Sequence, residues 1–197
     1  MTAAGIATRP MARGAGRLHT VAIIVVTAVV IGIVAYLVGG TGDDGVTKVN
    51  LTGAAGVAPA VGDLPPDFTA KTWDGKTVSL SDYAGKPLWL MFGASWCPDC
   101  RSEAADVEAA YVKYQPKGLA LLAVFISEPA TDIGGYAQRA GLTFPIAVDA
   151  NTRIASSYQT LGIPTHFFIG ADGRIREIRI GALQPSDMDA AVAALVP

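Results

Sequence analysis

The chain has 197 residues, a formal net charge of −2 at pH 7 and two cysteines, and 51% of its residues are hydrophobic. All seventeen acidic residues follow position 38, so most of the chain is acidic and a poor partner for nucleic acid. The length is sufficient for one domain with a hydrophobic core of its own.

The first element in chain order is an apolar segment over residues 21–38 that contains no charged residue. As a helix it would be about 27 Å long, against about 30 Å for the hydrocarbon core of a membrane. Three arginines precede this segment and two aspartates follow it. The positive-inside rule therefore predicts a cytoplasmic basic N-terminus at 1–20, a single-pass anchor in a bacterial cell membrane at 21–38, and an extracytoplasmic remainder. A cleaved signal peptide is the alternative, because small residues follow the segment.

Residues 39–63 are rich in glycine, alanine and threonine and show neither a helical nor a strand period, which predicts a flexible linker. The domain is then expected over 64–197. Its predicted elements are a hairpin at Asp74-Gly75, buried strands over 86–95 and 119–127, a helix from the cysteines to Pro116, a helix over 133–140, a strand over 144–149, a short helix over 152–158, a hairpin at Asp172-Gly173, and a last helix capped by Ser186. Strands that alternate with helices predict an α/β fold with a mixed central sheet.

Both cysteines lie in the motif Trp96-Cys97-Pro98-Asp99-Cys100, where a predicted buried strand ends and a helix begins. Pro98 suits the first helical position, which places Cys97 at the N-cap. The free amides and the dipole of the helix stabilise a thiolate there, which lowers the pKa of Cys97 from about 8.5 towards 7. Cys97 is therefore the predicted nucleophile, and Cys100, one turn later, is the predicted resolving thiol. A structural disulfide that closes so short a loop would add little stability.

The motif "WCPDC" after a buried strand and the later "GIPT" resemble the membrane-anchored thioredoxin-like thiol-disulfide oxidoreductases of the ResA/TlpA type, with an AhpC/TSA-redoxin-like domain. The resemblance implies a thioredoxin fold with an N-terminal β-hairpin extension and a β-α insertion, preceded by one transmembrane helix. It also implies a cis peptide bond between Ile163 and Pro164 beside the dithiol. Trp96, Ile163 and Pro164 are then expected to bind substrate, and Pro164 belongs to the catalytic set.

Cys100 must give its proton to an acceptor during exchange. The residue that accepts it in thioredoxins is absent from this chain. Thioredoxins carry a buried carboxylate six residues before the first cysteine, and here that position is Met91. The resemblance implies that Glu103 acts instead, from the cysteine-bearing face of the helix. The alternative is a solvated glutamate in the first turn, where the helix dipole favours it.

The direction of electron flow is predicted from Asp99, whose negative charge disfavours the Cys97 thiolate and so favours a reductant of protein disulfides. The resemblance implies protein thiol and disulfide substrates, a role such as cytochrome c maturation, and a membrane electron donor of the CcdA or DsbD type, without a cofactor or metal. One alternative is an extracytoplasmic thiol oxidant of the same fold. Another is a Cu(I)-binding or delivery module that uses Cys97, Cys100 and His166, although a lone histidine on an apolar strand is more typical of a core residue.

Overall fold

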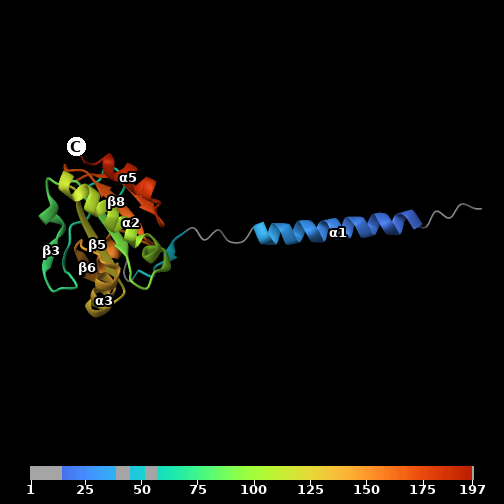
Figure 1. Cartoon of the computed structure of the whole chain (residues 1–197), viewed down its shortest axis with the longest axis horizontal. Helices are drawn as coiled ribbons and strands as arrows, with labels where there is room; N and C mark the ends of the chain where they lie inside the picture. The colour runs from blue at the N-terminus through green and yellow to red at the C-terminus, as the bar shows by residue number, and fades with distance from the viewer. Residues whose placement is uncertain (1–14, 39–44, 52–56, 197) are drawn as a thin grey trace, which may run out of the picture. The chain divides into compact units, whose positions relative to one another are not determined.

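The computed structural model describes residues 15–38, 45–51 and 57–196 of the chain, which divides into two units, Met1–Asp43 and Asp44–Pro197. The first unit contains helix α1 (Ala15–Val38), which Figure 1 shows as a single helix. The side chains described on it are exposed. Over the described residues, no helix combines the length and the apolar character needed to cross a membrane. Most of the predicted cytoplasmic N-terminus and two parts of the predicted linker, 39–44 and 52–56, lie outside the described residues.

The second unit alternates strands and helices as predicted. Its elements are β1 (Thr47–Lys48), β2 (Thr69–Lys71), β3 (Thr77–Ser79), the 3-10 helix η1 (Leu80–Tyr83), β4 (Leu88–Gly93), α2 (Pro98–Tyr114), the 3-10 helix η2 (Gln115–Lys117), β5 (Ala120–Ile126), α3 (Ala130–Ala140), β6 (Ile146–Asp149), α4 (Arg153–Ser157), β7 (Gly162–Ile163), β8 (Thr165–Ile169), β9 (Ile175–Ile180) and α5 (Pro185–Ala193). The predicted hairpins are β2–β3 and β8–β9.

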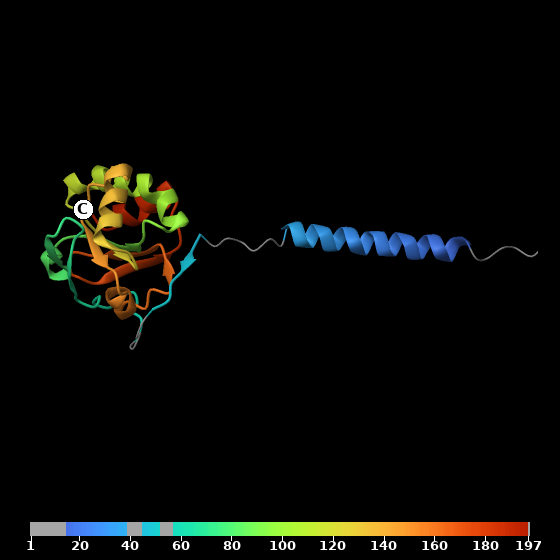
Figure 2. The same ribbon diagram turned by 90° about the horizontal axis from the view of Figure 1, so that it is seen from below.

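The central sheet has five strands in the order β6-β5-β4-β8-β9. Strands β4, β5 and β6 run parallel, whereas β8 is antiparallel to β4 and β9 is antiparallel to β8. The sheet is therefore mixed, as the sequence predicts. Figure 2 shows α2, α3 and α5 over one face of the sheet and α4 on the other face. This arrangement is a mixed α/β thioredoxin-like fold.

The middle strand, β4, supplies side chains to both faces of the sheet and is buried along its whole length. Successive side chains of a strand alternate between faces. Trp89 and Met91 join the cluster formed with α2, α3 and α5, and Leu90 and Phe92 join the cluster formed with α4. The strand is therefore held from both sides, which fixes the position of the loop that follows it.

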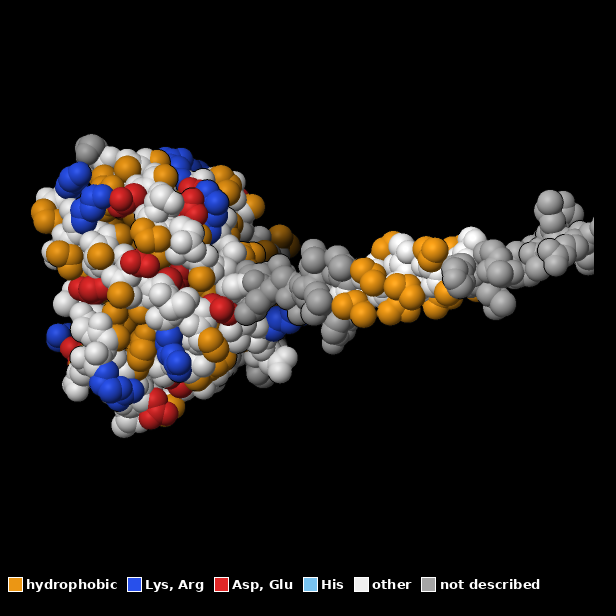
Figure 3. Space-filling model, turned by 45° about the vertical axis from the view of Figure 1, so that its right-hand side comes forward, with side chains coloured by type: hydrophobic (Ala, Val, Ile, Leu, Met, Phe, Trp, Pro, Cys, Tyr) orange, Lys and Arg blue, Asp and Glu red, His pale blue; other side chains and the backbone are white. Residues whose placement is uncertain are grey.

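On the face of the domain shown in Figure 3, Lys and Arg side chains are interspersed with Asp and Glu and with apolar side chains. That face offers no continuous basic surface of the kind that binds the backbone of a nucleic acid.

Two predicted details are wrong. The N-cap of α5 is Gln184 and not Ser186, because Pro185 takes the first helical position. Within the predicted flexible linker, Thr47–Lys48 form a strand that pairs with β7. The end of that linker is also ordered against β9, because the N–H of Gly62 donates to the carbonyl of Ile175 at 2.8 Å.

The contact between α3 and Trp73 gives a test of the packing. A Cβ at Gly134 would lie 2.6 Å from Cε3 of Trp73, whereas a Cβ at Gly135 would meet only the flexible end of Arg139 at 3.1 Å. Gly134→Ala should therefore lower the free energy of unfolding by about 1–3 kcal/mol. The control Gly135→Ala should raise it by up to about 1 kcal/mol, because alanine is the better helix former. Denaturant unfolding measures both, and equal shifts would contradict this packing.

Candidate active site

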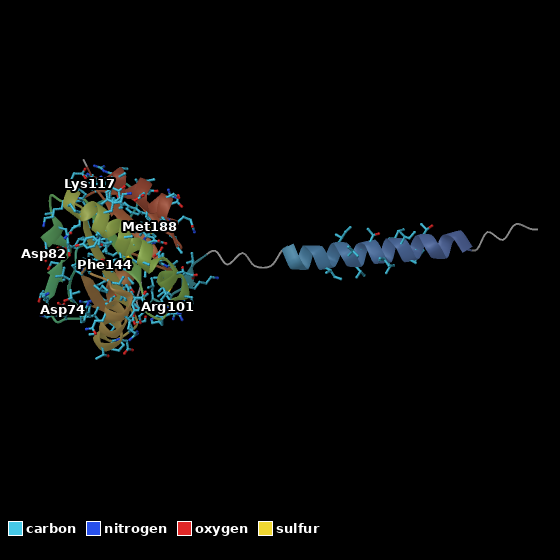
Figure 4. The ribbon with its side chains drawn as sticks, in the orientation of Figure 1. Asp74, Asp82, Arg101, Lys117, Phe144 and Met188 are labelled. Atoms are coloured by element: carbon cyan, nitrogen blue, oxygen red, sulfur yellow. A yellow bond between two sulfur atoms is a disulfide. The ribbon has the colours of Figure 1, made fainter. Side chains whose placement is uncertain are left out.

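The dithiol lies at the junction between the central strand and the longest helix of the domain. Strand β4 ends at Gly93, and α2 begins at Pro98. Cys97 is the N-cap of α2. The backbone N–H of Cys100 donates to Sγ of Cys97 at 3.2 Å, and a disulfide joins the two cysteines. The predicted N-cap position of Cys97 is confirmed. Arg101, labelled in Figure 4, belongs to the first turn of this helix.

A second segment reaches the dithiol from the other half of the domain. The peptide bond between Ile163 and Pro164 is cis, as the resemblance implies, and both residues are buried. Sγ of Cys97 lies 3.9 Å from the carbonyl oxygen of Ile163. The hydroxyl of Thr165 donates to the carbonyl of Gly162 at 2.6 Å and ties this turn to β8. The motif residues predicted to meet at the dithiol therefore do meet there.

The surroundings of the two sulfur atoms are closed. Cys97 is 0% exposed and Cys100 is 4% exposed, whereas Trp96 beside them is 42% exposed. The indole N–H of Trp96 donates to the carbonyl of Ile126 at 3.3 Å, which holds the ring at the edge of the site. Both thiol positions are therefore shielded from solvent, and the sequence did not predict this for Cys97.

Thr47 of β1 contacts the sulfur of Cys97. Its Oγ1 atom lies 3.4 Å from Sγ of Cys97, and its hydroxyl donates to Oδ2 of Asp99 at 3.1 Å. The sequence analysis missed this contact. The one available signal is the run "VTKV", in which three of four residues are β-branched, within an otherwise glycine- and alanine-rich segment. Residues that are β-branched favour strands.

Glu103 is buried on α2, with 2% of its surface exposed. Its Oε2 atom accepts the N–H of Leu183 at 2.8 Å, and its Oε1 atom lies 3.4 Å from Nε2 of His166. The alternative of a solvated first-turn glutamate is therefore wrong. The carboxylate faces the interior three residues after Cys100, where α2, β8 and the segment before α5 meet.

His166 is a fully buried residue of β8 between Trp89 and Glu103. The indole N–H of Trp89 donates to Nδ1 of His166 at 3.2 Å. Because Nδ1 accepts this hydrogen bond, a neutral imidazole carries its proton on Nε2, the nitrogen that faces Glu103.

The copper alternative needs Cys97, Cys100 and His166 to converge on one ion. Across the described ranges of the chain, no three His, Cys, Asp or Glu side chains are grouped so that they could hold a metal. Both nitrogens of His166 instead face Trp89 and Glu103. The geometry therefore gives the copper alternative no support.

Glu128, which follows β5, fixes the loop that carries the motif. Its carboxylate accepts the backbone N–H of Ser95 at 2.7 Å and also the hydroxyl of Ser95. Burial raises the pKa of Glu128, and the two hydrogen bonds from Ser95 oppose that rise only in part. No sequence motif marks Glu128, because the contact joins residues 33 positions apart.

The raised pKa of Glu128 predicts a pH dependence of stability. The folded protein binds this proton more tightly than the unfolded chain, so the contribution of Glu128 to the free energy of unfolding falls as pH rises from below about 4.3 through the folded pKa. In Glu128→Gln this contribution is absent, and the amide can still bond both groups of Ser95. As pH rises from about 4 to 7, the free energy of unfolding of wild type, measured by denaturant unfolding, should therefore fall relative to that of Glu128→Gln. A constant difference would contradict the assignment.

Comparison with known proteins places this site in a family. The family model described as the AhpC/TSA family matches residues 61–178. The thiol-disulfide oxidoreductase ResA of Geobacillus thermodenitrificans is 35% identical over 131 residues, which cover 66% of this chain and 75% of the relative. ResA of Geobacillus kaustophilus is 34% identical over 140 residues, which cover 71% and 80%. A thiol:disulfide interchange protein of the thioredoxin family from Chlorobium tepidum has a TM-score of 0.62 and 26% identity, over 73% of this chain and 100% of that chain. The chain belongs to the AhpC/TSA family, and it is a thioredoxin-like thiol-disulfide oxidoreductase.

Proposed function

We propose that this oxidoreductase reduces disulfides of other proteins outside the cytoplasmic membrane, for example during cytochrome c maturation. The observation that carries the proposal is the asymmetry of the dithiol. Cys97 is the N-cap of α2 and lies against the carbonyl of Ile163, and Cys100 is inside the first turn of the helix. One sulfur is thus placed to exchange with a client and the other to complete the exchange.

The proposed reaction begins from the reduced dithiol. The Cys97 thiolate attacks one sulfur of a client disulfide, forms a mixed disulfide and releases one client thiolate. Cys100, once deprotonated, attacks Sγ of Cys97 and releases the second client thiolate. Two electrons pass to the client, and the enzyme is left with the Cys97–Cys100 disulfide. A separate donor must then return two electrons.

We propose Glu103 as the group that accepts the proton of Cys100. The two residues lie three positions apart on the buried face of α2. The N–H of Leu183 donates to Oε2 of Glu103 at 2.8 Å, and Nε2 of His166 lies 3.4 Å from Oε1. A carboxylate positioned beside the resolving thiol can serve as a general base.

The direction of electron flow is proposed from charge. Asp99 is half-buried between the two cysteines of the motif, and its carboxylate accepts the hydroxyl of the same Thr47 that contacts Cys97. A negative charge near Cys97 disfavours the thiolate and therefore the reduced dithiol, which makes the reduced protein a better electron donor. The alternative is a thiol oxidant of the same fold, and a measured reduction potential above that of a typical client would favour it.

The location is proposed from the sequence. Residues 21–38 contain no charged residue and three arginines precede them, which supports a membrane anchor with the dithiol domain outside. A reductant outside the cytoplasm depends on electrons carried across the membrane, so we propose a polytopic donor of the CcdA or DsbD type as its partner.

The assignment of the two cysteines can be tested by trapping. Full-length Cys100→Ser should form mixed disulfides through Cys97 that it cannot release, because the internal thiolate is missing. Complexes isolated from membranes, resolved by a reducing agent and identified by mass spectrometry, should contain extracytoplasmic thiol proteins or a polytopic donor. The control Cys97→Ser should trap far fewer. Equal trapping by the two variants, or none by either, would refute Cys97 as the nucleophile.

The role of Glu103 can be tested by kinetics. Glu103→Gln keeps the shape of the side chain but loses the base, so resolution of a mixed disulfide should slow by about tenfold or more and its pH profile should change. The matched control is Asp106→Asn, which removes one negative charge from the same helix. Stopped-flow measurement of thiol release from a mixed disulfide with a small aromatic thiol follows this step. An unchanged rate and pH profile in Glu103→Gln would remove Glu103 from the mechanism.

A further inference from the structure

Strand β1 lies along the edge of β7, immediately beside the cis peptide bond (Figure 2). The pairing is antiparallel, with Thr47 opposite Ile163 and Lys48 opposite Gly162. The N–H of Val49 extends the pairing by donating to the carbonyl of Leu161 at 2.9 Å. The backbone groups of β7 that face outward at the dithiol are therefore bonded to the chain's own segment.

The side chains of β1 fit this edge closely. Oγ1 of Thr47 lies 3.4 Å from Sγ of Cys97, the buried nucleophile. Val46 lies over Gly162, where a Cβ would be only 2.3 Å from Cγ1 of Val46. Because Gly162 has no side chain, the side chain of Val46 fits beside it and β1 can approach β7. The side chain of Thr47 thus lies against the sulfur of Cys97, and the side chain of Val46 lies against Gly162.

We propose that β1 is an internal occupant of the client-binding site, with Thr47 in the place of the client's reacting cysteine. The inference rests on the proposed function. A client disulfide that approaches Cys97 from this edge would meet Thr47, which lies 3.4 Å from Sγ of Cys97. An extended client segment at this edge would need the same backbone groups of Leu161 and Ile163. The clients are therefore extended protein segments that bind as an added strand, and each client must displace β1.

The displacement breaks hydrogen bonds between β1 and β7 but no covalent bond, and it needs no cofactor. Backbone pairing at a strand edge does not depend on the side chains of the added strand, so β1 and a client compete through equivalent hydrogen bonds. With β1 in place Cys97 is 0% exposed. Departure of β1 is the step that opens the site.

The position of Thr47 is tested by a crosslink in the full-length chain. In Thr47→Cys with Cys100→Ser, Cys97 attacks glutathione disulfide and releases one glutathione thiolate. The thiolate at position 47 then attacks Sγ of Cys97 and releases the second glutathione. The control is Lys48→Cys with Cys100→Ser, because side chains of a strand alternate and position 48 points away.

Peptide mass spectrometry of the protease-digested proteins measures the intrachain disulfide. It should form at least tenfold faster with position 47 than with position 48. Equal rates for the two variants would overturn the proposal.

The occupancy of the client-binding site by β1 is tested by weakening the pairing of β1 with β7 without changing the catalytic residues. Val49→Pro removes the N–H that donates to Leu161. The control is Lys48→Pro, because hydrogen-bonded and non-bonded pairs alternate along an antiparallel ladder and the N–H of Lys48 therefore points away from β7. Reduced Val49→Pro should be alkylated at Cys97 by iodoacetamide several-fold faster than wild type, and it should reduce a disulfide-bonded peptide faster. Lys48→Pro should match wild type.

The outcomes separate the two proposals. Unchanged alkylation and reduction rates in Val49→Pro would overturn the occupancy of the site by β1, while the exchange activity of wild type would still stand. If position 47 forms its crosslink and Val49→Pro is alkylated faster, but neither wild type nor Val49→Pro reduces a protein disulfide, then the occupancy is supported and the proposed reductant function fails.

Discussion

The site depends on one constraint: the packing of the strand and loop before α2 fixes Cys97 at the N-terminus of that helix. Strand β4 is buried along its whole length between two core clusters, so the chain that leaves it has little freedom. Ser95 in the connecting loop is bonded to Glu128, and Cys97 then caps the helix. The free amides of the first helical turn point at this sulfur, which favours the thiolate that attacks a disulfide. Ile163 of the cis turn and Thr47 of β1 both contact the sulfur of Cys97, which this junction places.

The two sulfurs differ because their surroundings differ. Cys97 faces the edge of β7, where another strand can lie, whereas Sγ of Cys100 lies 3.5 Å from the place of a Cβ at Gly93 and faces the interior. The carboxylate that thioredoxins carry on the central strand is missing, because that position is Met91. His166 is the cross-strand neighbour of Met91, and it faces Glu103. The buried carboxylate three residues after Cys100 thus lies on α2 rather than on β4.

The fold and the dithiol could be predicted from the sequence because their signals are local. Apolar runs marked β4 and β5, and Pro98 marked the start of α2 and hence the N-cap at Cys97. The cis bond before Pro164 followed from a family resemblance. The burial of Glu103 could not be read from the chain, because it depends on Leu183 and His166 meeting at one point. Strand β1 was missed for a related reason, since two residues show no period and the strand exists only through its pairing with β7. The cap of α5 was misplaced by two residues because Pro185 was not given the first helical position.

The central claim is that the junction makes Cys97 the reactive thiol and Cys100 the protected one. The most direct test is the pH dependence of alkylation of each cysteine in the reduced full-length protein, followed by mass spectrometry of the labelled peptides. The account predicts that Cys97 is labelled first, with a midpoint below the value of about 8.5 for an ordinary thiol. Cys100 should stay unlabelled over the same range. If the two cysteines are labelled at similar rates with ordinary midpoints, the junction does not activate Cys97 and the account is wrong.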